Sequence, residues 1–484
     1  MSQRFLAIQR ILGVIIVLSS LSKLPPALLA WWWGEDTVRV FVTSFGLSAL
    51  IGALLWLPVR QVKYELRLRD GFLIVTLTWV FASLVSALPL MYGPPFLSFA
   101  DAVFEATSGL TTTGATVIIG LDTLPKSVLF YRQLLQFLGG MGIVILAVAI
   151  LPMLKIGGTQ LFRAESTGPS KDSKLTPRIA ETAKALWAVY FGLIVLCAIS
   201  FWLGGMSFFD AVCHALSTVS TGGFSTHDAA FEHWNNPILD WIAIVFMVLG
   251  GINFGLHFVA WRRASVEVYG NDSELRAFLR ILVVASLCIA ALLWSGGVYD
   301  SGAEAIRRAT FQAVSAMTTT GFAVGGFDQW PGPAPLLVIG LAFIGGCSGS
   351  TVGGLKVARV VMVLRQGYRE IKQLVHPKAQ FLVKMGGKRV SESVVLSVSG
   401  FIAIWMLCFV LLMLGMNLAG LDVESSFGAT AATMTNLGPG LGSVSSNFAN
   451  ASDGAVWLGS LAMVLGRLEV FSLLVLFTPQ FWRE

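Results

Sequence analysis

Four short segments of this chain share a Thr/Ser-rich sequence that ends in glycine, and we number them loop 1 to loop 4. They read Thr111-Thr112-Thr113-Gly114, Ser220-Thr221-Gly222-Gly223, Thr318-Thr319-Thr320-Gly321 and Thr435-Asn436-Leu437-Gly438. Their last glycines lie 109, 98 and 117 residues apart. This period is too long for a solenoid repeat. It fits a repeating unit of one membrane span, a re-entrant loop and a second span.

The residue types of the loops suit the binding of a dehydrated monovalent cation. Glycine reaches backbone angles that allow successive carbonyl groups to point the same way. Thr111, Ser220, Thr318 and Thr435 would add a ring of hydroxyl groups at one end. No loop contains a carboxylate, which argues against Ca²⁺. Four such loops around one axis therefore predict a cation filter lined by backbone carbonyls.

A short apolar segment precedes each loop and must position it. We expect half-length helices at 98–110, 207–219, 303–317 and 423–434. At 1.5 Å per residue each covers roughly 20 Å, which is too short to cross a bilayer. The C-terminal end of each helix, which carries partial negative charge, would face the loops. Non-helical backbone is tolerated at membrane depth only where protein buries it or where it lines a watery cavity.

The composition places the whole chain in a membrane. Of its 484 residues 55% are hydrophobic and 12% are charged, about half the charged fraction of soluble domains. We expect an all-α polytopic membrane protein with four pseudo-symmetric repeats around one pore and two extra N-terminal helices. The ten expected spans are roughly 6–31, 38–58, 72–92, 128–152, 183–204, 237–260, 277–296, 334–364 (interrupted), 394–416 and 455–480. The expected division is 1–70 for the N-terminal extension and 71–155, 156–263, 264–366 and 367–484 for repeats 1 to 4.

The charges are distributed by side of the membrane. Of 33 Lys and Arg residues, 26 lie in the first ten residues, at 59–70, 155–184, 261–280 and 356–389, and in the C-terminal tail. The positive-inside rule makes this side cytoplasmic, with both termini inside, so the net charge of +6 needs no nucleic-acid-binding face. Acidic residues on the other side would attract cations, although some equally suit helix caps. They are Asp101, Glu105, Asp122, Asp210, Asp228, Glu232, Asp300, Glu304, Asp328, Asp422, Glu424 and Asp453.

Cysteine and histidine indicate no further site. The five cysteines are odd in number and lie mostly in apolar segments, so we expect free thiols. The five histidines do not cluster along the chain, and no metal site of that kind is predicted. We expect local hydrogen bonds, and not proton relay, to account for His214 and His257.

One expected span, 334–364, is interrupted by a segment that we call the glycine-rich break. It consists of Gly345, Gly346, Cys347, Ser348, Gly349, Ser350, Thr351, Val352, Gly353 and Gly354. Such a break usually lines a cavity or marks a moving part, and the alternative is a kinked helix that fills space. Its position predicts a gate just below the filter. The sequence GSTVGGLK lacks the spacing of a nucleotide-binding P-loop.

Two positive charges fall within expected spans. An arginine at a span centre, such as Arg467, costs roughly 2.5–3.5 kcal/mol and usually faces the protein interior. Arg467 is either a positive charge below the filter, acting as a barrier or holding the gate, or part of a buried ion pair with Glu469 or another carboxylate. The i, i+2 spacing of Arg467 and Glu469 disfavours their direct pairing. Lys356 is a second candidate pore charge, or a topogenic charge at the membrane edge.

The segments SGLTTTGATV, STVSTGGFS, AMTTTGFAVGGF and TNLGPGLG resemble the four filter loops of the Trk/Ktr/HKT superfamily of potassium transporters. Over essentially the whole chain, the resemblance is greatest to bacterial Trk pore-forming subunits of the TrkH type. It implies one pseudo-fourfold pore per chain and an intramembrane gating loop at the glycine-rich break. It implies K⁺ selectivity, because Gly114 stands where sodium-passing relatives tend to have serine. The implied K⁺ ligands are the carbonyls of Thr111, Thr112, Ser220, Thr221, Thr318, Thr319, Thr435 and Asn436.

The resemblance also implies features that composition and spacing do not show. These are a homodimer in the lipid of the bacterial inner membrane and a separate cytosolic ring of the TrkA type that binds NAD or ATP. The resemblance implies K⁺ as the bound ion, and no organic cofactor is expected in this chain.

Two other functions stay open at this stage. A secondary transporter coupled to H⁺ or Na⁺ also uses broken helices, but it usually shows two inverted halves and not four like-oriented units. A membrane-embedded enzyme would need a Ser/His/Asp, paired-carboxylate or metal-ligand set within a span, and none stands out.

Overall fold

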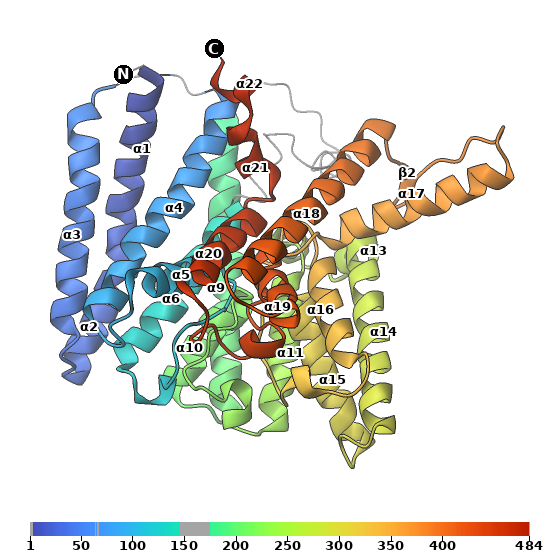
Figure 1. Cartoon of the computed structure of the whole chain (residues 1–484), viewed down its shortest axis with the longest axis horizontal. Coiled ribbons are helices and arrows are strands. Elements are labelled where there is room, and N and C mark those ends of the chain that lie inside the picture. Colours follow the sequence, from blue (N-terminus) through green and yellow to red (C-terminus); the bar gives the residue numbers. More distant parts are fainter. Residues whose placement is uncertain (1–2, 63, 65–66, 146–174, 484) are drawn as a thin grey trace.

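The structure is a computed structural model that describes residues 3–62, 64, 67–145 and 175–483. As predicted, the described chain is helical. Its strands are the two-residue β1 (Lys384–Met385) and β2 (Lys388–Arg389), which pair antiparallel. Both ends of the chain lie on the same side of the molecule (Figure 1).

The N-terminal extension forms a helical hairpin at one edge of the molecule (Figure 1). It contains α1 (Gln3–Ser20), η1 (Leu21–Lys23), α2 (Leu24–Trp33), α3 (Val38–Trp56) and η2 (Leu57–Val59). Gly13 and Gly52 allow α1 and α3 to approach closely, since a Cβ on Gly13 would lie 2.7 Å from the Trp56 nitrogen. Glu35 joins the hairpin to the next helices by accepting a hydrogen bond from the Lys126 nitrogen (2.9 Å).

The remaining helices follow in four groups, each with a long helix, a half-length helix, a loop and further helices. The first group contains α4 (Leu68–Tyr92), α5 (Phe99–Leu110), η3 (Leu121–Thr123) and α6 (Lys126–Ile145). The second contains α9 (Leu175–Leu203), α10 (Phe208–Val219), η5 (Ala230–His233), α11 (Pro237–Gly251), α12 (Phe254–Arg263) and α13 (Glu267–Asn271). The third contains α14 (Ser273–Ser295), α15 (Gly302–Met317), η6 (Phe327–Gln329), α16 (Ala334–Ile344) and α17 (Val357–Val375). The fourth contains α18 (Glu392–Leu418), α19 (Val423–Met434), η7 (Gly442–Val444), α20 (Asp453–Arg467), α21 (Phe471–Leu474), η8 (Val475–Phe477) and α22 (Pro479–Trp482).

Six described helices are long and apolar enough to cross a bilayer, judged by length and composition. They are Gln3–Trp33, Val38–Val59, Arg69–Tyr92, Ala183–Leu203, Ser273–Ser295 and Glu392–Leu418, and each corresponds to an expected span. The interrupted span at 334–364 is divided between α16 and α17. The expected span at 128–152 begins with α6, and its residues from 146 onward lie outside the described part of the chain.

Two further spans were expected to be continuous, and this was wrong. The helices α11 and α12 meet at 96°, and α20 bends by 103° relative to Phe471–Phe477. At the first bend the Asn253 side chain caps α12 by accepting from the Gly255 nitrogen (2.7 Å). At the second bend Glu469 and Val470 have φ values of 54° and 50°, which an α-helix cannot contain.

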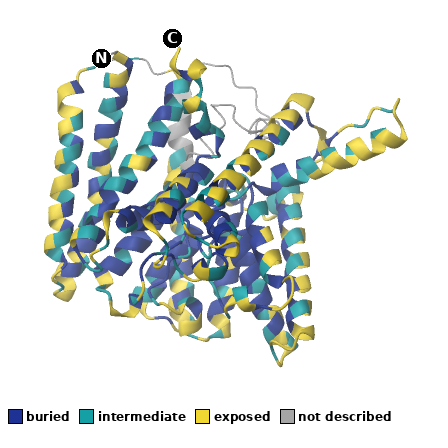
Figure 2. Cartoon of the chain, viewed as in Figure 1, coloured by how far each residue is buried: buried dark blue, intermediate teal, exposed yellow. Residues whose placement is uncertain are grey.

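Burial is concentrated around the half-length helices, whereas the outer faces of the long helices are exposed (Figure 2). These exposed faces carry many large apolar side chains. Val284 on α14 is 61% exposed and Leu396 on α18 is 71% exposed. In α5 all residues from Ala102 to Leu110 are buried. An apolar exterior around a centre of buried loops is the arrangement expected in lipid, where irregular backbone must be enclosed by protein.

Candidate functional site

The four loops share one backbone conformation. In each loop the second and fourth residues have positive φ. The second residues are Thr112 (51°), Thr221 (54°), Thr319 (47°) and Asn436 (58°), and the fourth are Gly114 (83°), Gly223 (81°), Gly321 (82°) and Gly438 (98°). Positive φ at a residue other than glycine costs about 1–3 kcal/mol and persists only where the surroundings impose it. Loop 4 therefore adopts the common conformation even though Asn436 replaces threonine.

The loops form a closed ring in chain order. Each final glycine faces the carbonyl oxygen of the third residue of the next loop, and loop 4 returns to loop 1. A Cβ atom would lie 2.2 Å from Gly222 O at Gly114, 1.9 Å from Thr320 O at Gly223, 2.0 Å from Leu437 O at Gly321 and 2.6 Å from Thr113 O at Gly438. A side chain at any of these positions would have to displace the facing carbonyl, so the ring keeps this geometry only with glycine at all four.

The hydroxyl groups of the first loop residues make local bonds. Thr111, Thr318 and Thr435 each donate to the carbonyl four residues earlier, at 2.7 Å, and so end the half-length helices. Ser220 donates to Ser217 O (3.1 Å). In the described conformation these hydroxyl groups bond to the last turn of the half-length helix that precedes each loop. This is because a short hydroxyl side chain can reach the carbonyl groups three or four residues earlier.

A cavity of about 270 Å³, which we call the loop cavity, opens at the glycine ends of the loops. Gly114, Gly223, Gly321 and Pro439 line it. Its wall includes the acidic residues Asp228, Glu232 and Asp328, together with Arg132 and His227. Part of the predicted acidic rim therefore surrounds the entrance to the ring.

Other members of the predicted rim serve local structure. Ser98 and Asp101 cap α5 reciprocally, because Ser98 Oγ donates to the carboxylate (2.8 Å) and accepts from the Asp101 nitrogen (3.2 Å). Ser207 and Asp210 repeat this arrangement on α10. The assignment of Glu105 to the rim was wrong. It is fully buried and pairs with Arg132 at 2.7 Å, because it faces α6 and not the solvent.

The glycine-rich break contacts the other end of the ring. The Gly353 nitrogen donates to Thr319 Oγ1 (2.8 Å) and the Gly354 nitrogen donates to Thr435 O (3.0 Å). Thr221 Oγ1 donates to Thr351 Oγ1 (3.0 Å). A Cβ on Gly353 would lie only 2.0 Å from Thr435 O. The break therefore lies against the first two residues of loops 2, 3 and 4, and glycine is required for this approach.

The break is held in place from its outer side. The Cys347 nitrogen donates to Gly251 O (3.0 Å), and Gly349 O accepts from the Phe254 nitrogen (3.1 Å). These two bonds tie the break to the bend between α11 and α12. Glu274, in the first turn of α14, accepts from the Ser348 nitrogen (2.8 Å). A single kinked helix would not need such a set of anchors.

Arg467 joins loop 1 to the break. Its Nε donates to Thr111 O (2.7 Å), its Nη1 donates to Thr351 O (2.9 Å) and its Nη2 donates to Thr112 Oγ1. The hypothesis of an ion pair with Glu469 was wrong, because Glu469 pairs with Arg359 at 2.6 Å. Among the residues that the structure describes, no carboxylate lies within ion-pair distance of Arg467. The other candidate charge, Lys356, donates from Nζ to Val352 O within the break.

Two contributions to the site were missed in the sequence. Gln136 on α6 donates to Gly222 O (2.6 Å) and accepts from the Phe224 nitrogen (3.3 Å), so it holds loop 2. A polar side chain inside an apolar span was the available signal.

The second contribution is a histidine cluster that was predicted to be absent. His227 and His233 stack with ring centroids 3.6 Å apart, and Asp122 bonds to His227.

The surroundings of these histidines differ from those of His214. The carboxylates of Asp210 and Asp122 raise the pKa of His227 above its usual value. His214 is buried and bonds to Asp210 O (2.9 Å) and Ser225 Oγ (3.1 Å), as expected for a locally satisfied histidine.

All five cysteines are free thiols, as predicted.

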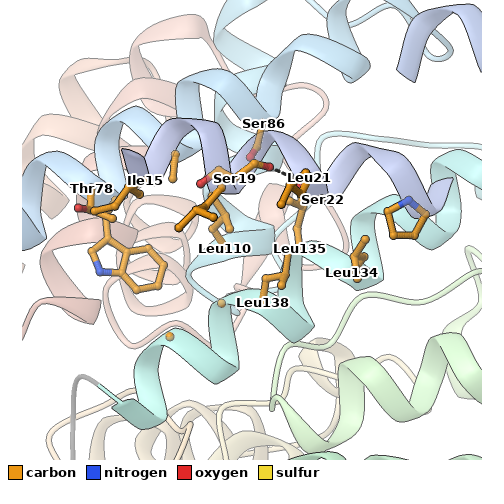
Figure 3. Close-up of a pocket in the computed structure, with 16 residues that line it drawn as sticks. Ile15, Ser19, Leu21, Ser22, Thr78, Ser86, Leu110, Leu134, Leu135 and Leu138 are labelled. Atoms are coloured by element: carbon orange, nitrogen blue, oxygen red, sulfur yellow. Dashed lines mark hydrogen bonds between the residues drawn. The ribbon is translucent and has the colours of Figure 1, made fainter. Parts of the chain in front are cut away.

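An apolar cavity of about 460 Å³ lies apart from the ring (Figure 3). It is enclosed by the N-terminal hairpin, α4 and α6, and its lining includes Leu134, Leu135 and Leu138. No residue of the four loops lines it, and its polar groups are few. Because an ion path needs polar ligands or water, this cavity is not part of one.

Comparisons with known proteins decide the family. A family model described as TrkH, cation transport protein, matches residues 38–483. The chain belongs to the TrkH family. The resemblance seen in the four loops is therefore confirmed, as is the prediction of a multi-pass helical membrane protein. Membership of a family of transport proteins also agrees with the expectation that the chain is not an enzyme.

Relatives match the chain over its full length. The Trk system potassium uptake protein TrkH of Vibrio parahaemolyticus is 49% identical over 484 residues, covering 99% of this chain and 100% of the relative. TrkH of Escherichia coli K12 is 47% identical over 481 residues, with the same coverage. TrkI of Halomonas elongata is 33% identical over 486 residues, covering 100% of this chain and 98% of the relative. The crystal structure of the potassium transporter TrkH from V. parahaemolyticus superposes with a TM-score of 0.92 at 46% identity, covering 99% of this chain and 100% of that one.

Proposed function

We propose that this chain is the K⁺-conducting subunit of a Trk-type uptake system and that K⁺ crosses the membrane through the ring of four loops. The closed ring of glycine–carbonyl contacts is the observation that carries this proposal. A ring of this kind lets backbone oxygens replace the hydration shell of a monovalent cation. The names of the relatives, which are potassium uptake proteins of Trk systems, support the choice of ion.

The proposed ligands are backbone carbonyls, with no organic cofactor. They belong to Thr111, Thr112, Ser220, Thr221, Thr318, Thr319, Thr435 and Asn436. The four half-length helices all end at the loops, so the partial negative charge of four C-terminal ends is directed at the ring. The acidic residues around the loop cavity add a field that attracts cations.

We further propose that the glycine-rich break and Arg467 close the ring in the described conformation. Two of the proposed ligands, Thr111 O and Thr435 O, accept hydrogen bonds from Arg467 and from the Gly354 nitrogen. These donors occupy the positions that a departing ion would use, and the guanidinium adds a positive charge there. Conduction then requires the break to move away from the first residues of the loops.

Ion flux from the purified protein in liposomes tests the proposal. We expect K⁺ and Rb⁺ to pass better than Na⁺ or Li⁺, because carbonyl oxygens replace the hydration shell of the larger ions at lower cost. Equal K⁺ and Na⁺ flux would contradict the filter. The alternative, an H⁺- or Na⁺-coupled transporter, predicts that the K⁺ reversal potential shifts when a proton or sodium gradient is imposed. A reversal potential set by K⁺ alone would exclude coupling.

The contact between the break and loop 4 gives a second test. The variant Gly353→Ala places a Cβ 2.0 Å from Thr435 O, so the break can no longer lie against the ring. We expect K⁺ flux to rise several-fold while the protein still folds, because Gly353 has no positive φ to strain. The matched control is Gly340→Ala on α16, where a Cβ meets nothing within 4 Å. Unchanged flux in folded Gly353→Ala would reduce the break to a structural kink.

The proposed setting is the bacterial inner membrane, with both termini in the cytoplasm and the chain in a homodimer. The basic residues that follow the break support this orientation, because positively charged segments outside the bilayer are enriched on the cytoplasmic side. These residues lie on α17 and the β1–β2 turn, which protrude from the body of the molecule (Figure 1). We propose that the basic residues of α17 receive a TrkA-type nucleotide-binding ring. Co-purification of that ring with the parent chain, and with a variant in which Lys and Arg residues of α17 are changed to Gln, tests this docking.

The division into an N-terminal extension and four pore repeats at 71–155, 156–263, 264–366 and 367–484 belongs to the same proposal.

A further inference from the structure

Three side chains from two different loop exits meet beside the loop cavity. Asp122 lies in η3, which follows loop 1, whereas His227 follows loop 2 and His233 ends η5. One ligand atom from each residue lies within 4.8 Å of the other two. His227 itself lines the loop cavity together with Gly114 and Gly223. The cluster is therefore adjacent to the proposed ion path.

One ring nitrogen of His227 makes no hydrogen bond. Its Nδ1 bonds to Asp122 Oδ1. Its Nε2 is buried, has no hydrogen-bond partner and lies 3.5 Å from Asp210 Oδ1. A buried imidazole nitrogen without a hydrogen bond is unusual, because buried polar groups are normally satisfied, and a metal ion could bind there between His227 and the nearby carboxylates. His233 is exposed, so the cluster can be reached from solution.

The donor set favours a transition metal over the transported ion. Two imidazoles and a carboxylate are the common ligands of Zn²⁺, whereas K⁺, Mg²⁺ and Ca²⁺ take oxygen. Zinc ligands at about 2.0–2.2 Å from the metal lie roughly 3.4 Å apart in a tetrahedron. For all three residues to bind one Zn²⁺, their ligand atoms must therefore move closer to one another by little more than an ångström. Side-chain rotation suffices for this, since Asp122 and His233 are exposed.

We propose that Asp122, His227 and His233 form a Zn²⁺-type site whose occupation reduces K⁺ entry. The effect on flux rests on the proposed function, whereas the binding of metal does not. A divalent cation at this position replaces part of the negative field of Asp210, Asp228 and Glu232 by positive charge at the entrance. It also links the segments that leave loops 1 and 2, so it restrains the ring on that side.

Calorimetric titration of the full-length protein with ZnCl₂ tests the binding directly, at a pH above neutral where imidazole ligands are deprotonated. We expect one Zn²⁺ per chain. His233→Ala should weaken binding by more than tenfold, since loss of even an outer-sphere partner costs about 10–100-fold. The control is His376→Ala, an exposed histidine at the end of α17, which should leave binding unchanged. Equal affinity in His233→Ala, or equal loss in the control, would overturn the site.

Liposome flux tests the effect of occupation. External Zn²⁺ should lower K⁺ flux through the parent protein, a chelator should restore it, and His233→Ala should conduct normally but be insensitive. Bound Zn²⁺ with unaltered K⁺ flux would overturn the inhibitory role. Absence of K⁺ flux without Zn²⁺ would instead contradict the proposed function, and the calorimetric result would still decide the metal site.

Discussion

Replacing Arg467 by methionine should increase K⁺ flux through the reconstituted protein by about tenfold or more. The guanidinium bonds loop 1 through Thr111 O and the glycine-rich break through Thr351 O. A hydrogen bond from a charged group contributes about 1.5–3 kcal/mol, and about 1.4 kcal/mol corresponds to tenfold in an equilibrium constant. Loss of the Thr351 bond alone is thus enough to shift the break toward its displaced position. Single-channel or liposome flux measurements would give the size of the change.

The same variant should remain folded. Removing one partner of a buried ion pair typically costs about 3–5 kcal/mol, because the other charge stays unpaired. Arg467 bonds carbonyl and hydroxyl oxygens, and no carboxylate pairs with it in the described chain. Arg10→Met, in the N-terminal hairpin, is the control for removing a cation away from the ring. A lower melting temperature without increased flux in Arg467→Met would show that Arg467 is scaffold and not part of the gate.

The variant Gly114→Ser should reduce the K⁺ over Na⁺ flux ratio by about tenfold, a difference of about 1.4 kcal/mol. Its Cβ would lie 2.2 Å from Gly222 O, so the carbonyl of loop 2 must move. The φ of +83° adds about 1–2 kcal/mol of backbone strain at a residue other than glycine. Selectivity depends on the geometry of the coordinating carbonyl oxygens, and a displaced Gly222 carbonyl shifts the backbone that carries the neighbouring proposed ligand, Thr221 O. Paired flux measurements in K⁺ and in Na⁺ would quantify the ratio.

Gly120→Ser separates backbone strain from the clash. Gly120 has almost the same φ, +81°, but its nearest neighbour to an added Cβ is Thr123 Oγ1 at 3.5 Å. This control should keep the parent selectivity. A Gly114→Ser protein that discriminates as well as the parent would show that the carbonyl ring does not set selectivity.

The sequence predicted the local parts of the site well. Helix α5 begins within one residue of the expected start, and α19 has the expected bounds. These helices are marked by signals inside a dozen residues, such as the Ser98–Asp101 cap and the glycine that ends each loop. The family was also recognisable, because four short motifs in register are a specific pattern.

The partners of Arg467 could not be predicted, because Thr111 and Thr351 lie 356 and 116 residues away and meet it only in the assembled ring. The bends at Asn253 and Glu469 were missed for a related reason. The first bend directly follows Gly250 and Gly251, a signal that the prediction did not use. Contacts with distant segments accompany each change of direction. They are the bonds of Gly251 and Phe254 to the glycine-rich break at the first bend and the Arg359–Glu469 pair at the second. The His227–His233–Asp122 cluster likewise forms only because loops 1 and 2 are neighbours.

The contact between Gly438 and Thr113 O sets an order on the biogenesis of the protein. The first loop leaves the ribosome long before its partner in the fourth, since roughly 320 residues separate Gly114 from Gly438. At about 5–20 residues per second, synthesis of that length takes tens of seconds. During this interval loop 1 lacks the neighbour that loop 4 provides, and its strained backbone is supported from the loop 2 side alone. A nascent chain that stops before loop 4 therefore carries loops 1 to 3 but has an open, unformed ring, so ion conduction can begin only after translation is nearly complete.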